Sequence, residues 1–134
     1  MSIKSAGSTS SSTTSNVQQQ QLLFKLAGAN LQSGSAQPFT KVYAGSAYFP
    51  TLIVARQRTG AASVSCLGGI SDGTNAVVAA TQAWTTLASG VIVSAVLAAL
   101  VNTTLLSVTP SLMLATPSTG ACTADFYIFG IDLS

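Results

Sequence analysis

The sequence predicts an all-β protein, an antiparallel β-sandwich or jelly roll with an extended N-terminal arm. Short apolar runs are separated by Gly, Pro, Ser and Asp at intervals of roughly ten residues, a pattern typical of sandwiches with about seven or eight strands. The run at residues 121–133 alternates between two faces, as a strand does. A chain of 134 residues is long enough for one domain with a substantial core.

Residues 1–21 form a separate, low-complexity region, and the sandwich domain is expected at 22–134. The region is rich in Ser and Thr and then in Gln, so alone it buries too little apolar surface to offset its ordering entropy. We expect it to act as an assembly arm that lies in a groove of a neighbouring chain or adds to its sheet edge. The alternative is a simple linker. The arm residues of interest are Ile3, Lys4, Val17, Gln18, Gln19, Gln20 and Gln21.

The first half of the domain is predicted to contain four strands. A short strand at 22–27 is followed by a loop and by a second strand at 37–44, with Pro38 near its start, where a missing backbone donor does least harm. A central β-hairpin then joins runs 48–56 and 62–70 through a turn at 58–61, because a Gly between two β-type runs is a hairpin signal.

The second half begins with a turn at Asp72 and Gly73 and a strand at 75–80. Glycines 68 and 69 are assigned to the same turn region. Residues 91–101 fit either a helix or a buried strand, and we favour the strand because the surrounding sequence is β-type. Residues 105–116 read as one or two strands interrupted at Pro110.

The final strand and the first run of the hairpin both suggest a second buried surface. In the final strand, Cys122, Ala124, Phe126 and Ile128 form a core face, while the other face begins polar and turns aromatic. In the hairpin, residues on both sides of the run are apolar. We therefore expect contact with another subunit, with these interface candidates: Phe49, Ile53, Arg56, Arg58, Tyr127, Phe129 and Ile131.

Composition argues against several function classes. The chain has no His and no Glu, so the usual general acids, bases and activated nucleophiles are missing, and we predict no enzyme activity. No phosphate-binding loop or metal-ligand spacing is present, and no cofactor or metal is expected. The net charge of +2 is too small and scattered for a nucleic-acid site. The longest apolar run is too short to span a membrane, and no secretory signal is recognisable.

Charged residues make up only 6% of the chain, compared with roughly 25% in an average soluble domain. Long β runs with so few charges aggregate through open edges and apolar faces unless other protein covers them. This favours a structural protein that works in an assembly. Arg56 and Arg58 lie at a strand end, where they either pair with Asp125, Asp132 or a neighbour's carboxylate, or remain solvated.

Cys66 and Cys122 both fall on faces that are expected to point inward. A buried free thiol that packs as a small apolar group is the favoured interpretation. A disulfide within the chain or between subunits is the alternative.

Residues 39–133 resemble a known family. The run YFPTLIVARQRTGAASVSCLGGISDGTNAVVAATQAWTTLASGVIVSAVL and the closing strand TADFYIFGIDL, with Gly130, resemble the small β-sandwich head decoration (cement) proteins of tailed bacteriophages. The resemblance implies a homotrimer on the virion capsid surface, made in the host cytoplasm, that clamps the major capsid protein lattice through its domain and an N-terminal arm. The two cysteines do not belong to this pattern.

Two other functions remain open from the sequence. One is a neck, tail or fibre-base component, which belongs to the same structural class. The other is a carbohydrate-binding jelly roll, which needs an exposed aromatic platform that only Trp84, Tyr43 or Tyr48 can provide.

Overall fold

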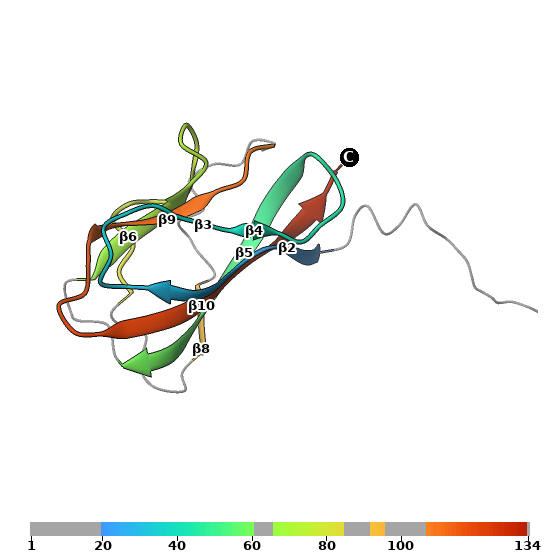
Figure 1. Cartoon of the computed structure of the whole chain (residues 1–134). Helices are drawn as coiled ribbons and strands as arrows, with labels where there is room; N and C mark the ends of the chain where they lie inside the picture. Colours follow the sequence, from blue (N-terminus) through green and yellow to red (C-terminus); the bar gives the residue numbers. More distant parts are fainter. Residues whose placement is uncertain (1–19, 61–65, 85–91, 96–106, 134) are drawn as a thin grey trace, which may run out of the picture.

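The chain folds into two antiparallel β-sheets that pack against each other (Figure 1). The computed structural model describes residues 20–60, 66–84, 92–95 and 107–133. One sheet has five strands in the order β4 (Thr40–Lys41), β2 (Gln20–Asn30), β10 (Cys122–Asp132), β5 (Tyr48–Gly60) and β8 (Ile92–Ala95). The other has four, in the order β3 (Gln37–Pro38), β9 (Ser111–Thr116), β6 (Leu67–Ser71) and β7 (Ala76–Val78). The predicted β-sandwich is confirmed.

The core contains side chains from both sheets and from the segments that join them. The predicted core face of the last strand is confirmed, because Cys122, Ala124, Phe126 and Ile128 are all buried. Trp84 packs edge-on against Phe126 with ring centroids 5.2 Å apart. At the other end of the sandwich, the rings of Phe24, Tyr43 and Tyr48 meet edge-to-face at 4.8 to 5.8 Å.

Strand β10 is the centre of the larger sheet (Figure 1). It pairs along its whole length with β5 on one side and along most of it with β2 on the other. Both ladders contain irregularities. Between Ala124 and Phe126, the single residue Asp125 faces two residues of β2, the second of which is Gly28 with φ +66°. This is a β-bulge with glycine in the left-handed conformation that such bulges favour.

The predicted hairpin of residues 48–56 and 62–70 is wrong. Strand β5 continues to Gly60 and pairs with β10 and β8, whereas β6 belongs to the other sheet and pairs with β7 and β9. Gly60, with φ +69°, does take a conformation that favours glycine, but it lies at the end of a long strand opposite Cys122. A glycine between two strands indicates a change of direction. It does not indicate whether the next strand pairs with the previous one or joins a second sheet. Residues 61–65 lie outside the described part of the chain.

The predicted single strand at 37–44 is in fact divided between the two sheets. β3 pairs with β9 in the smaller sheet, and β4 pairs with β2 in the larger one. Phe39 sits between them with a buried side chain, and its N–H donates to the carbonyl of Pro110 at 3.0 Å. Pro38 is the second residue of β3, which is an edge strand, so its missing backbone donor does little harm there.

The turn at Asp72 and Gly73 is confirmed. Asp72 Oδ1 accepts hydrogen bonds from the N–H groups of Asn75 and Thr74 at 2.6 and 2.9 Å, and Gly73 has φ +99°. Burial opposes ionisation of Asp72, but these hydrogen bonds outweigh it, so the pKa of the carboxyl is lowered. The ionised carboxylate therefore stabilises the turn that the sequence predicts.

Glycines 68 and 69 do not belong to that turn but lie inside strand β6. A Cβ on Gly68 would lie 2.5 Å from a methyl carbon of Leu114, and one on Gly69 would lie 2.5 Å from the carbonyl oxygen of Val78. The two glycines therefore let the neighbouring β9 and the end of β7 approach the β6 backbone closely.

The remaining elements agree with the sequence in part. The described residues of the ambiguous run at 91–101 form strand β8, while 91 and 96–101 lie outside the described part. Strand β9 begins directly after Pro110. Gln20 and Gln21, assigned to the arm, are the first residues of β2; Ile3, Lys4, Val17, Gln18 and Gln19 lie outside the described residues. No helix suited to crossing a membrane is found in the described residues.

We expect Gly69→Ala to lower the free energy of unfolding by about 1 to 3 kcal/mol, because the added methyl group has to displace the backbone at Val78. Gly34→Ala is the matched control, since its Cβ would meet only Pro117 at 3.8 Å and should change stability by less than about 0.5 kcal/mol. Urea unfolding of both variants measures the difference. Equal urea midpoints for the two variants would contradict the close approach of the Val78 backbone to Gly69.

Candidate interaction surface

The larger sheet has one face that points away from the smaller sheet, and this outer face carries apolar side chains. Along β10, Phe126 and Ile128 are fully buried in the core, while Tyr127, Phe129 and Ile131 alternate with the inward positions and are only partly buried. The outer half of the strand is therefore apolar although it is not part of the core between the sheets.

Neighbouring strands extend this surface. Val54 and Leu52 on β5 lie opposite Tyr127 and Phe129, and both are partly buried. Leu22 on β2 also lies opposite Phe129, and Phe49 lies opposite Ile131. We name this set the apolar outer row; its members are Leu22, Phe49, Leu52, Val54, Tyr127, Phe129 and Ile131. Aromatic and aliphatic residues paired across strands in this way make a continuous surface.

The interface candidates from the sequence divide between the two faces. Phe49, Tyr127, Phe129 and Ile131 belong to the apolar outer row, but Ile53 is 0% exposed and packs in the core. The assignment of Ile53 to an interface is therefore wrong. The cause is an irregularity in the pairing of β5 and β10. Pro50 and Leu52 pair with two consecutive residues of β10, so Thr51 between them is an extra residue of β5. An extra residue reverses the faces, so Phe49 and Ile53 point to opposite sides despite their even spacing.

The sequence alone missed Leu22, Leu52 and Val54 as members of this surface. Alternation along the strand places Leu52 and Val54 on the face opposite to Ile53, but nothing in the sequence indicates which face meets the second sheet. Leu22 is the start of the strand that the sequence predicts at 22–27. The signal that would have found all three is the pairing of β2 and β5 with β10.

Basic residues lie at one end of this face. Arg58 Nη1 is 3.4 Å from Asp125 Oδ1, and Asp125 also accepts a hydrogen bond of 2.8 Å from the N–H of Gly28. The carboxylate thus joins β5 to the bulge of β2, and the predicted pairing of an arginine with Asp125 is confirmed for Arg58. Arg56 lies opposite Asp125 and is exposed, and Lys25 lies opposite Tyr127 and is also exposed.

Both cysteines are free and buried in the core, in agreement with the favoured interpretation. Burial raises the pKa of the Cys66 thiol, and the nearby Cys122 adds to this effect. Burial also raises the pKa of Cys122. Both groups therefore remain protonated at neutral pH and are poor nucleophiles.

The aromatic residues considered for a carbohydrate platform are not accessible. Trp84 is 1% exposed, and its indole N–H donates to the carbonyl of Gly68 at 3.1 Å. Tyr48 is fully buried with its hydroxyl donating to the carbonyl of Val108 at 3.0 Å, and Tyr43 is buried beside it. Burial is also the main cause that raises the pKa of Tyr48. These side chains hold the core together and cannot stack on a sugar.

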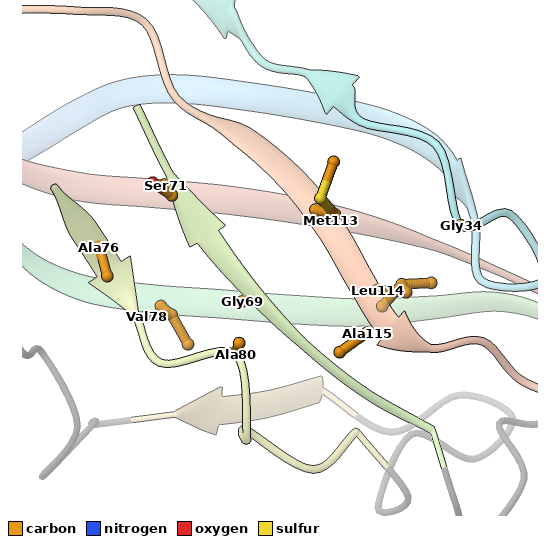
Figure 2. Close-up of a pocket in the computed structure, with 9 residues that line it drawn as sticks. All are labelled: Gly34, Gly69, Ser71, Ala76, Val78, Ala80, Met113, Leu114 and Ala115. Carbon is orange, nitrogen blue, oxygen red and sulfur yellow. The ribbon is translucent and has the colours of Figure 1, made fainter. Parts of the chain in front are cut away.

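A groove of about 360 Å³ lies on the smaller sheet, over β6, β7 and β9 (Figure 2). Its wall is made mostly of small side chains such as Ser71, Ala76, Ala80 and Ala115, with the exposed Met113 at its side. None of the described residues that line it is charged. Ser71 provides the one polar side chain among the described lining residues, and its hydroxyl already donates to the carbonyl of Asn75 and accepts from the N–H of Gly73.

The chain's few acidic groups do not gather at one place. Asp72 caps its turn, Asp125 pairs with Arg58, and Asp132 lies at the end of β10. Within the described residues, no group of three His, Cys, Asp or Glu side chains is positioned to hold a metal ion.

Comparison with known proteins adds no relatives. No protein family matches the chain, and neither a curated protein nor a solved structure is significantly similar to it. Function therefore has to be argued from the residues and surfaces described above.

Replacing Asp125 should weaken the junction of β2, β5 and β10. We expect Asp125→Ala to lower the free energy of unfolding by about 1.5 to 3 kcal/mol, because Gly28 and Arg58 lose a charged acceptor. Arg58→Ala should cost less than about 1 kcal/mol, since its side chain is 53% exposed. Urea unfolding tests both. A larger cost for Arg58→Ala would show that the ion pair, and not the bulge, is the important contact.

The thiols should be unreactive in the folded protein. Because Cys66 and Cys122 are buried and their pKa values are raised, we expect Ellman's reagent to label neither at neutral pH until urea unfolds the chain, and then to label both. Absence of labelling after unfolding, with labelling restored by a reductant, would instead reveal a disulfide.

Proposed function

We propose that this chain is a non-enzymatic structural protein of a virion, a capsid decoration protein that binds the major capsid protein lattice as a homo-oligomer. The observation that carries the proposal is the apolar outer row, an apolar surface on the outside of a protein with very few charges. The resemblance of residues 39–133 to decoration proteins of tailed bacteriophages supports the same class and makes a trimer the expected oligomer.

The energetics favour covering this surface with protein. Burying an apolar side chain completely contributes about 1.5 to 3 kcal/mol, and the members of the row are only partly buried within their own chain. Each therefore retains part of that free energy for contact with a partner. Contiguous apolar surface on the outside of a domain often marks an interaction site.

The N-terminal arm adds to this function. Strand β2 starts at Gln20, which pairs with Ile131 and accepts a hydrogen bond of 2.7 Å from the hydroxyl of Thr51. Strand β2 thus begins next to the apolar outer row. An arm that starts there can follow the same partner surface, and several weak contacts in each oligomer add up through avidity. The domain then bridges seams between capsid subunits, and the arm extends the contact.

The test is co-sedimentation of the purified chain with empty capsids assembled from the major capsid protein of the same genome, together with native mass spectrometry for the oligomer. We expect a homotrimer that pellets with capsids. Phe129→Ser should weaken binding at least tenfold, because a tenfold change needs only about 1.4 kcal/mol. Met113→Ser, on the other sheet and 53% exposed, is the matched control and should bind normally.

A monomer that stays soluble at micromolar concentration and does not pellet with capsids would contradict the proposal. Equal loss of binding in Phe129→Ser and Met113→Ser would show that capsid contact does not depend on the apolar outer row.

A further inference from the structure

The charges of this protein are distributed unevenly, and the outer face of the larger sheet carries the excess. Lys25, Arg56 and Arg58 lie on this face together with a single carboxylate, Asp125. Three cations and one anion leave a charge of +2, which equals the formal net charge of the whole chain. The other charged residues are Lys4, Lys41, Asp72 and Asp132, and they cancel.

The positions of these groups matter as much as their number. Asp125 is 6% exposed and is already engaged by Arg58 and the N–H of Gly28, so it offers no negative charge to a partner. Lys25 and Arg56 are both exposed on either side of β10, close to Tyr127. The chain contains no Glu, and the other two aspartates are not on this face: Asp72 lies in the turn after β6 of the smaller sheet, and Asp132 is paired with Tyr48, whose side chain is buried in the core.

We infer that the outer face of the larger sheet docks on a protein surface that is apolar in its centre and edged by carboxylates, and that this surface belongs to the capsid lattice and not to a second copy of the chain. The inference rests on the proposed function and specifies its partner surface. If two copies met through this face, Lys25 and Arg56 of each chain would find no free carboxylate on the same face of the other copy, because Asp125 is already engaged, and unpaired charges in an interface disfavour the wrong partner. A carboxylate-edged partner instead pairs each cation while the apolar outer row is buried.

A lysine elsewhere provides a matched control for the charge. Lys41 on β4 lies opposite Phe24, whose side chain points into the core, so Lys41 projects from the other side of the sheet than Lys25. Its amino group lies 4.7 Å from the ring centroid of Tyr43. Reversing Lys41 changes the net charge by the same amount as reversing Arg56 but leaves the outer face unaltered.

The experiment measures binding to the same empty capsids, at low and high salt, for wild type, Arg56→Glu, Lys25→Glu and Lys41→Glu. We expect Arg56→Glu and Lys25→Glu each to weaken binding about tenfold or more, and Lys41→Glu to bind like the wild type. Raising NaCl from about 0.05 to about 0.3 M should weaken the wild type more than Arg56→Glu, because salt screens the charges that the variant has lost. Circular dichroism melts confirm that each variant is folded.

The outcomes separate this inference from the proposed function. If the wild type binds capsids and Arg56→Glu binds equally well, the decoration function stands and the acidic partner surface is ruled out. If Phe129→Ser dissociates the homo-oligomer in native mass spectra, a second copy occupies the face and the inference is wrong. Competition for this face by a poly(dT) oligonucleotide would assign it to nucleic acid and also overturn the inference. A wild-type chain that does not bind capsids overturns both proposals.

Discussion

The pairing of β10 with β2 and β5 at the same time is the interaction on which the rest of the structure depends. These ladders satisfy the backbone on both edges of β10 and bring together residues that are about a hundred positions apart, such as Gln20 and Ile131. The same strand supplies Phe126 and Ile128 to the core and Tyr127 and Phe129 to the outer face. The core and the candidate interaction surface are therefore formed by the two faces of the same strand, and both depend on β10.

Irregular pairing decides which side chains reach each face. The bulge at Gly28 is fixed by Asp125, and the extra residue Thr51 in β5 allows both Phe49 and Leu52 to face outward. Regular pairing over the whole of β5 would place Phe49 and Ile53 on the same face, and one of the two surfaces would lose an apolar side chain. Bulges thus let an eleven-residue central strand serve two apolar surfaces at once.

The sequence correctly predicts the features that depend on a local pattern, and it does not predict those that depend on pairing between strands distant in the chain. The alternation from Cys122 to Ile128 and the Asp72 turn were predicted correctly because each depends on neighbours in the chain. The hairpin failed because nothing near Gly60 reveals that the next strand crosses to the other sheet. The sequence predicts a turn at Gly68 and Gly69, because the close contacts that require glycine there come from β9 and from residues 78–80 and leave no sign in the local pattern. The two-residue alternation of a strand does not assign Ile53 to the correct face of the sheet, because one extra residue upstream reverses the two faces.

Because the chain has so few charged residues, the position of each one is informative. Where an average domain spreads charges over its surface to stay soluble, this one uses Asp125 and Arg58 to hold a strand junction and leaves Lys25 and Arg56 beside an apolar row. Lys25 and Arg56 are exposed beside aromatic side chains, and the carboxylate on the same face, Asp125, is already engaged by Arg58 and the N–H of Gly28, so solubility alone does not explain this arrangement. The cations and the apolar outer row fit one function if the row provides the free energy of docking and the cations determine which partner surface can bind. Charges at the edge of an interface select partners more than they add affinity.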